Sequence, residues 1–449
     1  MALGDSAVSN RQSVASALAS AFLAGPWTYE GMVERGAHVV GGRAPWLLAV
    51  VRGIRRFFPH PPVARMELLT ELLATRPALI KACRNPAVPV HLHRWLIPEP
   101  SMGQRPWPVP ELSTQAEVAR WLGVTDAQLG WLADGSGFER TSRPGQWRRY
   151  RYVWIPKRAG GKRLLEQPGV DLGRLQRQVL HGLLDLIPPH DAARGFVRGR
   201  GVRDFAEPHV GQAVVVHMDL EDFFHSVRPS KVWGVFRAAG YPDSVTEVLA
   251  GLCTNRTPGT VVEEAPRATH LGEQKARWRM TRRLTARHLP QGAPTSPALA
   301  NLAAYRLDVR LSALAAALGA RYTRYADDLA FSGGASLLQR PLRLVRCVAA
   351  IVREEGFAIR ADKTRVMHQG QQQRLAGVVV NAHPTVPRED YERLKAVLHL
   401  CRTRGPTSQN TEGHHDFRAH LLGRIAWVSH LHPSRGARLR ATFDRITWD

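Results

Sequence analysis

The tetrapeptide Tyr325-Ala326-Asp327-Asp328 constrains the fold more than any other stretch of this chain. Aromatic and β-branched residues precede it at 321–324, apolar residues follow it at 329–332, and two glycines close the segment. This pattern predicts a strand, a tight acidic turn and a second strand. Burying either carboxylate would be costly unless a positive charge compensates, and a divalent cation would supply that charge. A solvated Asp-Asp turn is the alternative, because Asp is a favoured turn residue.

The chain carries a large excess of positive charge. Its 449 residues include 62 Lys and Arg against 38 Asp and Glu, which gives a formal net charge of +24. A polyanionic partner would balance this excess, and nucleic acid is favoured over a membrane surface. The sequence has neither an apolar run of about 18 residues nor a secretory signal pattern. We therefore expect a cytoplasmic protein with no membrane partner.

The first third of the chain is organised by helical periodicity and prolines. Residues 1–96 have helical periodicity, and the proline-rich stretch 97–110 is typical of a linker. Within residues 113–129, Ser and Thr caps precede two short amphipathic segments separated by Gly123, which predicts a helix pair. Such pairs are commonly packing units, and a helix-turn-helix that reads DNA is the alternative.

A basic hairpin is predicted next. An apolar strand at 152–156 and a second strand at 164–166 flank the glycine-containing turn 157–163, which begins with Lys157 and ends with Arg163. Flexible cations at a hairpin tip suit a triphosphate or a phosphate backbone, because Lys acts as a point charge and Arg binds oxygens bidentately. A solvated charged turn is the alternative.

A third carboxylate follows a predicted buried strand at 213–218. The strand delivers Asp219 at its C-terminal edge, a usual place for catalytic residues carried by a sheet. Together with the two aspartates of the acidic turn, Asp219 would allow a pair of metal ions to be held. Such a pair can clamp the attacking and leaving oxygens of an in-line phosphoryl displacement.

An irregular loop at 289–297 precedes a predicted helix at 298–318. Its prolines and Gly292 fix an irregular conformation before the helix start, where backbone N–H groups remain free to face a substrate. Gln291 is placed in this loop to contact an incoming nucleotide or the template.

The segments after the acidic turn complete the predicted sheet and add a basic helical region. The predicted elements are a helix at 336–356, a strand at 359–367 with Lys363 at its start, and a strand at 374–381. Residues 388–449 read as helical and basic. We expect Arg424, Arg435 and Arg438 in this region to bind nucleic acid, and a charged face on an ordinary helical bundle is the alternative.

This ordered series of motifs closely resembles a reverse transcriptase. The matching residues are 157–163, Asp219 with Phe223 and Phe224, 289–292, 325–328, Lys363 with Thr364, and the strand at Gly377. The sequence at 131–134, 195–196, 290–302 and 423–428 is similar to that of the bacterial retron group, so the resemblance covers about residues 111–449. Of the group's Val-Thr-Gly motif only Gly377 is kept, and no clear Asn-Ala-x-x-His occurs between Ser226 and Leu289.

The resemblance implies an α+β protein with the right-hand polymerase fold. Residues 1–110 would form a helical N-terminal extension and linker, and 111–215 the helix pair and fingers. Residues 216–381 would form a palm with an antiparallel sheet and finger elements, and 382–449 a helical thumb.

The resemblance also implies roles for single residues. Asp219, Asp327 and Asp328 would hold two Mg²⁺ ions, with the backbone carbonyl of Leu220 as a further ligand. Lys157 and Arg163 would bind the phosphates of a deoxynucleoside triphosphate, and Gln291 and Gly292 would contact the nucleotide or the template. Phe224 would act as a steric gate against a 2′-hydroxyl. Lys363 would donate a proton to the leaving pyrophosphate. Phe223 is the alternative gate, since neighbouring side chains point to opposite faces if the strand continues.

The retron likeness further implies the nucleic acids involved. A dedicated structured noncoding RNA would be both template and primer, and the product would be branched, RNA-linked single-stranded DNA (msDNA), used with an effector protein in antiphage defence. The alternatives are another bacterial reverse transcriptase, defence-associated or intron-type, and a non-catalytic RNA-binding scaffold.

Overall fold

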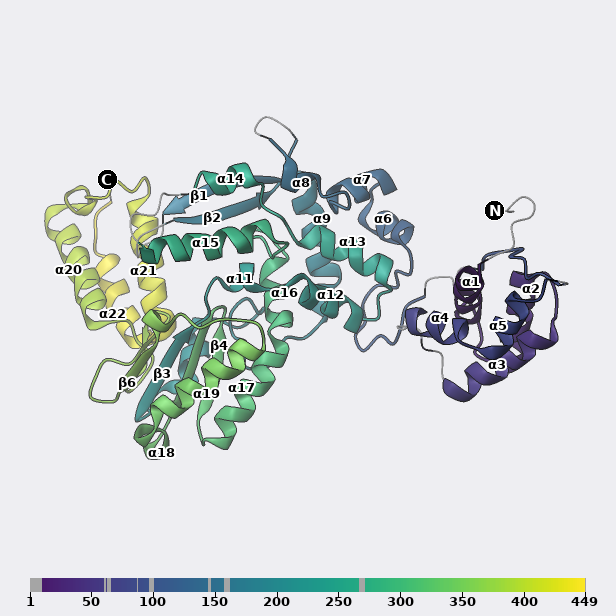
Figure 1. Cartoon of the computed structure of the whole chain (residues 1–449). Coiled ribbons are helices and arrows are strands. Elements are labelled where there is room, and N and C mark those ends of the chain that lie inside the picture. Colours follow the sequence, from purple (N-terminus) through teal and green to yellow (C-terminus); the bar gives the residue numbers. More distant parts are fainter. Residues whose placement is uncertain are drawn as a thin grey trace. The chain divides into compact units, whose positions relative to one another are not determined.

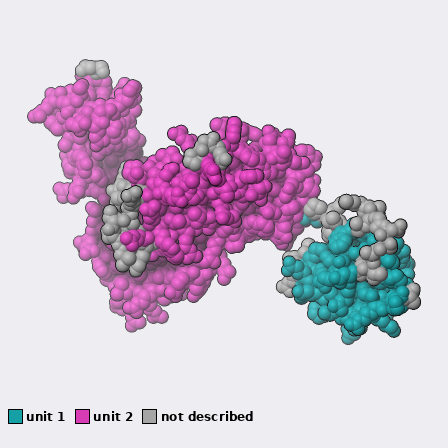
Figure 2. Space-filling view, turned by 45° about the horizontal axis from the view of Figure 1, so that its top comes forward, with its two compact units in different colours: residues 1–101 teal, residues 102–449 magenta. Residues whose placement is uncertain are grey.

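The computed structural model of the chain describes residues 10–448 apart from 60–61, 63–65, 87, 97–100, 144–146, 157–161 and 266–270. Two compact units make up the chain, residues 1–101 and residues 102–449, and Figure 2 shows them in different colours. The division falls in the proline-rich stretch 97–110, of which 97–100 lie outside the described residues. Among the described residues, no helix combines the length and the apolarity needed to cross a bilayer.

The first unit is built from helices around an apolar core. Its described helices are α1 (Arg11–Leu23), α2 (Tyr29–Val40), α3 (Pro45–Phe57), α4 (Met66–Ala74) and α5 (Pro77–Cys83). Leu18 and Phe22 of α1 are fully buried in one cluster with Met32 of α2 and Leu47 of α3. Because helices this short are marginal alone, burial of these apolar faces stabilises them.

The second unit begins with the predicted helix pair, α6 (Gln115–Leu122) and α7 (Asp126–Leu132). Thr114 and Glu117 form a capping box at the start of α6, which satisfies two backbone N–H groups that the helix leaves free. Both helices pack against α13 (Asp243–Cys253) in the main core. The pair is thus used for packing.

The predicted hairpin is also present. Strand β1 (Tyr150–Pro156) pairs antiparallel with β2 (Lys162–Pro168), and Pro156 lies opposite Lys162 at the end next to the connecting turn. The tip between the strands, including Lys157, lies outside the described residues.

A four-stranded antiparallel sheet forms the centre of the unit. Its strands lie in the order β4 (Arg321–Tyr325), β5 (Asp328–Gly333), β3 (Val214–Asp219) and β6 (Arg365–His368). Side chains alternate between its faces: Val214 and Val216 belong to the main core, whereas Val215 packs with the C-terminal helices. Both faces are therefore covered.

Of the remaining helices, α17 (Tyr305–Ala317) and α19 (Pro341–Glu354) lie beside this sheet, and α14 (Gly259–Glu263) and α15 (Leu271–Thr285) lie beside the hairpin of β1 and β2 (Figure 1). Between β2 and β4 lie α9 (Val170–Gly182), α10 (Val202–Ala206), α11 (Phe223–Ser226), α12 (Pro229–Ala238), α13, α14, α15, α16 (Ser296–Ala303) and α17; α8 (Phe138–Thr141) precedes β1. After β5 come α18 (Ala335–Gln339) and α19, and the chain ends with α20 (Arg388–Arg404), α21 (Phe417–Leu431) and α22 (Pro433–Phe443). The buried residues of α17 and α19 share the main core with β3 and β5.

Two predicted helices are each divided in the structure. The helix predicted at 298–318 consists of α16 and α17, because the backbone at Ala304 (ψ 1°) leaves the helical region. The helix predicted at 336–356 consists of α18 and α19, which meet at Arg340. Pro341 explains this break, since its ring cannot continue a helix but suits a first turn.

Two predicted strands are shorter than expected. The segment 374–381 forms a small hairpin of β7 (Arg374–Leu375) and β8 (Val378–Val379) rather than one strand. Its turn lies at Ala376 and Gly377, where φ is 44° and 88°, values that interrupt an extended chain. In the segment 359–367, Lys363 ends a 3-10 turn and the strand begins only at Arg365.

Candidate active site

Three carboxylates meet at one end of the central sheet. Asp219 ends β3 and lies directly opposite Asp328, which begins β5. Asp327 occupies the turn between β4 and β5, and its carbonyl accepts a hydrogen bond from the Leu220 N–H at 2.9 Å. Opposed residues of antiparallel strands have Cβ atoms about 5 Å apart. The sheet register thus gathers acidic groups that are distant in the sequence.

These carboxylates carry more negative charge than the nearby cations neutralise. Lys363 Nζ donates to Asp219 Oδ2 at 2.8 Å, and Arg360 Nε lies 3.6 Å from Oδ1. Among the described residues, Asp219 Oδ1 has no hydrogen-bond partner although it is buried. Burial, followed by the charges of Asp328 and Asp219, raises the pKa of Asp327 to about 6. Carboxylate oxygens that lie close together and whose negative charge is not fully neutralised are suitable ligands for Mg²⁺.

The acidic turn is held in an unusual backbone conformation. Ala326 has φ 55°, a left-handed value that costs a non-glycine residue on the order of 1 kcal/mol. Gly195 lies against this turn, and a Cβ added there would be 2.7 Å from the Ala326 nitrogen. Only a glycine at 195 therefore lets the two backbones approach so closely.

A buried ion pair that the sequence analysis missed supports the same turn. Arg324 donates to the carbonyl of Ala326 at 3.1 Å and to Asn301 Oδ1 at 2.9 Å. Its guanidinium also bonds to Asp308, and neither side chain is exposed. The one available signal was a charged residue within a strand that the pattern predicts to be half-buried.

A histidine that the sequence analysis also missed contacts the acidic turn. His217 Nε2 lies 2.8 Å from Asp328 Oδ1. His217 precedes Asp219 by two positions on β3, so both side chains point to the same face of the sheet. That alternation was the signal, and it becomes informative only once the neighbouring strand is known.

A cavity of about 370 Å³ opens beside the carboxylates. Of the residues predicted to bind substrate, those that line it are Arg163, Phe223, Phe224, Gln291 and Lys363, together with Asp327. Lys157 lies outside the described residues, and Gly292 is not part of the lining. The structure therefore brings most of the predicted set to one place.

The two phenylalanines are placed by a helix, and the expectation that β3 might continue through them is wrong. The strand ends at Asp219, Asp222 takes a left-handed conformation (φ 47°), and Phe223 begins α11. Phe223 is buried, with its ring 5.8 Å from that of Phe357. Phe224 is only half-buried, so it offers more surface to the cavity than Phe223 does.

The Gln291 loop is fastened to the basic hairpin. The Glu166 N–H of β2 donates to the carbonyl of Gln291 at 2.8 Å. Gly292 has φ 127°, and a Cβ there would lie 3.0 Å from the Glu166 carbonyl oxygen. Both the conformation and the close approach require glycine at 292.

The C-terminal helices bring two of the three predicted arginines together. Arg435 and Arg438 line a second cavity, of about 630 Å³, with Arg388, Tyr391 and Lys395 among its other residues. The Arg435 guanidinium lies 5.2 Å from the centre of the Tyr391 ring. Arg424, on α21, is not part of this lining.

Comparisons with known proteins agree with this geometry. The family described as reverse transcriptase (RNA-dependent DNA polymerase) matches residues 155–386. The chain is 40% identical over 350 residues to the retron Mx65 reverse transcriptase of Myxococcus xanthus, covering 77% of this chain and 74% of that protein. It is 35% identical to the retron Mx162 enzyme of the same organism (75% and 67% covered) and 31% identical to the retron Ec86 enzyme of Escherichia coli (56% and 69% covered).

Proposed function

Since this chain belongs to the retron-type reverse transcriptases, we propose that Asp219, Asp327 and Asp328 are its catalytic residues. The chain is an RNA-directed DNA polymerase with the right-hand polymerase fold, as its motifs predicted. The observation that carries the assignment is the meeting of the three aspartates at one end of the sheet, where one buried oxygen of Asp219 has no hydrogen-bond partner among the described residues.

The three aspartates would hold two Mg²⁺ ions, with the carbonyl of Leu220 as a further ligand. Bound there, such a pair activates the attacking hydroxyl and stabilises the leaving oxygen of an in-line displacement. The raised pKa of Asp327 supports this assignment, because it reports crowded negative charge that a divalent cation would relieve. In this structure Lys363 neutralises part of the charge of the Asp219 carboxylate. With substrate bound, Lys363 would protonate the leaving pyrophosphate.

The cavity beside the aspartates would receive the deoxynucleoside triphosphate. Arg163 and Lys157 would bind its phosphates, and Gln291 and Gly292 would contact the nucleotide or the template. Phe224 would exclude a 2′-hydroxyl from below the sugar. Its half-buried position in the cavity lining supports this choice over the buried Phe223.

The nucleic acid partner would be a dedicated structured noncoding RNA that serves as template and primer. Synthesis from an internal guanosine 2′-hydroxyl would yield branched msDNA, which would act with an effector protein in antiphage defence in the cytoplasm. Residues 111–215 would supply the helix pair and fingers, 216–381 the palm and 382–449 the thumb, with 1–110 as a helical extension. Arg424, Arg435 and Arg438 of the thumb would bind the nucleic acid.

The test is synthesis by the purified protein with the RNA encoded beside its gene, deoxynucleotides and Mg²⁺. We expect DNA covalently joined to RNA, and a 2′-linked branch nucleotide after RNase treatment. DNA without that branch would point to another kind of bacterial reverse transcriptase. A protein that binds the RNA but makes no DNA would be a scaffold.

A further inference from the structure

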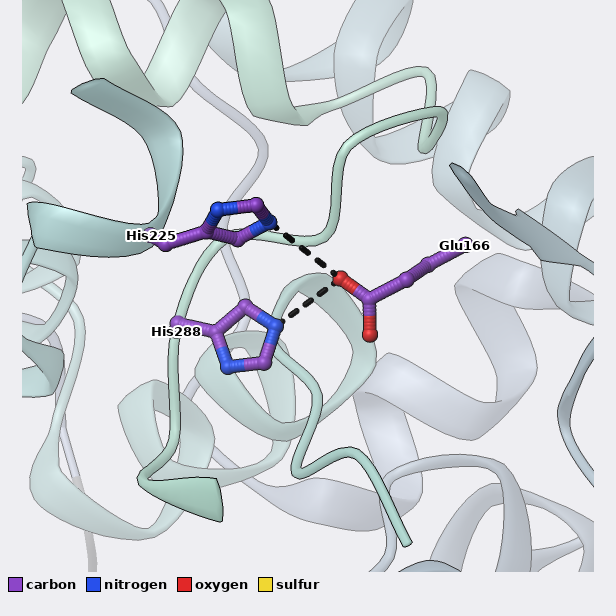
Figure 3. A group of neighbouring side chains, drawn as sticks. All are labelled: Glu166, His225 and His288. Carbon is purple, nitrogen blue, oxygen red and sulfur yellow. Dashed lines mark hydrogen bonds and ion pairs between the residues drawn. The ribbon is translucent and has the colours of Figure 1, made fainter. Parts of the chain in front are cut away.

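The side chains of Glu166, His225 and His288 form a triad next to the proposed nucleotide cavity, and none of these side chains has a role so far (Figure 3). Glu166 and His288 are buried, and His225 is partly buried. We propose that this triad is a positioning device that fixes the Gln291 loop and Phe224 against β2, and thereby sets nucleotide affinity and sugar discrimination. The inference rests on the proposed function of the cavity.

The Glu166 carboxylate is the centre of the triad. Its Oε2 lies 2.8 Å from His288 Nε2 and 3.7 Å from His225 Nε2, and Figure 3 shows both rings turned toward this one oxygen. Its Oε1 accepts hydrogen bonds from Asn255 Nδ2 at 2.9 Å and Thr257 Oγ1 at 2.8 Å. Glu166 and His288 are buried almost completely, so these bonds are not exchanged with water.

The hydrogen bonds of His288 define its charge. Its Nδ1 faces the carbonyl of Ala286 at 2.8 Å, and a carbonyl only accepts, so Nδ1 carries a proton. Its Nε2 faces an ionised carboxylate, which also only accepts, so Nε2 carries a second proton. Burial alone lowers the pKa of His288, but the Glu166 carboxylate outweighs it and the pKa is raised. His288 and Glu166 therefore form a buried ion pair.

The spacing fits a charge-assisted hydrogen bond better than a metal ion. Ligand atoms at about 2.0–2.1 Å around a tetrahedral zinc ion stand roughly 3.3 Å from each other. The His288–Glu166 separation of 2.8 Å is a charge-assisted hydrogen-bond length instead.

The triad joins the segments that carry the predicted nucleotide contacts. Glu166 lies on β2 and also donates its backbone N–H to Gln291, while His288 begins the segment that leads into the same loop. His225 directly follows Phe224, lines the cavity with it, and places its ring 5.1 Å from that of His288. Removing one partner of a buried, hydrogen-bonded charge network releases the elements that it joins.

The experiment compares incorporation of a deoxynucleotide and of its ribonucleotide on a primed RNA template. For Glu166→Ala and His225→Ala we expect KM for the deoxynucleotide to rise and the preference for deoxynucleotide to fall, each by roughly tenfold, with a smaller change in kcat. Glu166→Gln keeps an acceptor for Asn255 and Thr257 and can donate to a neutral His288, so its KM and its preference for deoxynucleotide should stay near those of wild type. If Glu166→Ala does not fold, His225→Ala and Glu166→Gln still carry the comparison.

His209→Gln is the matched control, because His209 is a buried histidine bonded to Ser332 and Thr323 rather than to the triad. The preference of the His209→Gln variant for deoxynucleotides should equal that of wild type, even if the variant is less stable. Equal discrimination in wild type and in the two alanine variants, Glu166→Ala and His225→Ala, would overturn the inference. One equivalent of zinc in the purified protein that Glu166→Ala loses would also overturn it. A wild-type protein that makes no DNA would instead overturn the proposed function.

Discussion

Arg324 donates hydrogen bonds to both carboxylate oxygens of Asp308, at 2.8 and 2.6 Å, and neither residue has exposed surface. The same guanidinium bonds to the carbonyl of Ala326, so the pair supports the turn that carries Asp327 and Asp328. An ion pair in the core thus connects α17 to the acidic turn.

Asp308→Asn should destabilise the protein strongly. Breaking a buried ion pair leaves an uncompensated charge, and the expected loss is about 3–5 kcal/mol in the free energy of unfolding. Urea or thermal unfolding measures it. The control is Asp444→Asn, which breaks an exposed pair with Arg440 and should cost less than about 1 kcal/mol. Similar losses of unfolding free energy in the two variants would show that Asp308 is not needed to compensate the buried charge of Arg324.

Gly195→Ala should reduce polymerisation more than it reduces stability. The added Cβ would meet backbone atoms of the acidic turn and force the carboxylates to move. A displacement near 1 Å can lower kcat by about 100-fold. Gly234→Ala is the control, since its Cβ would meet nothing within 4 Å and helical Gly→Ala changes are mildly stabilising. Equal kcat in the two variants would mean that the turn tolerates the displacement.

Asp327→Asn should abolish DNA synthesis and yet stabilise the metal-free protein. The substitution removes a buried carboxylate whose ionisation is opposed by burial, Asp328 and Asp219. The expected gain is on the order of 1–2 kcal/mol at pH 7.5 in the presence of a chelator, measured by thermal unfolding. DNA synthesis at the wild-type rate would refute the role of this carboxylate in holding Mg²⁺.

The ion pair of Glu166 and His288 should leave a signature in the pH dependence of stability. Burial raises the pKa of Glu166, but the charges of His288 and His225 outweigh it and hold the pKa well below its ordinary value of 4.5. The pKa of His288 is raised above its ordinary 6.5. The pair's contribution is therefore complete between about pH 4.5 and 6.5.

That contribution is lost as pH rises through the raised pKa of His288, and as pH falls through the lowered pKa of Glu166. Unfolding free energies of wild type and Glu166→Gln, measured from pH 4 to 9, should therefore differ most in wild type's favour inside this window. A difference that stays constant over the whole range would exclude the ion pair.

Arg435→Ala with Arg438→Ala should weaken RNA binding and reduce its salt dependence. Removing one arginine–phosphate interaction lowers the slope of log affinity against log salt by about 0.7–0.9, because fewer counterions are released on binding. Filter binding at several salt concentrations measures the slope. Arg393→Ala is the control, because Arg393 is exposed on α20 beside Asp390 and does not line the cavity. An unchanged slope in the double variant would remove this cavity from the RNA-binding surface.

Local sequence patterns determined the elements that carry the site. Three local patterns can be recognised without knowledge of the fold, because each depends on only a few neighbouring residues. They are the alternation around the acidic turn, the apolar strand before Asp219 and the turn residues at Gln291. The same patterns predicted the family and the right-hand fold, which the comparisons confirm.

Only the tertiary structure decided what surrounds those elements. His217 reaches Asp328 across 111 residues, and Glu166 reaches His288 across 122 residues, so no spacing in the chain connects these partners. Strand register and buried charge pairing bring them together, and both depend on how distant segments pack. A buried carboxylate needs a compensating partner, and for Glu166 and Asp308 the folded chain supplies one.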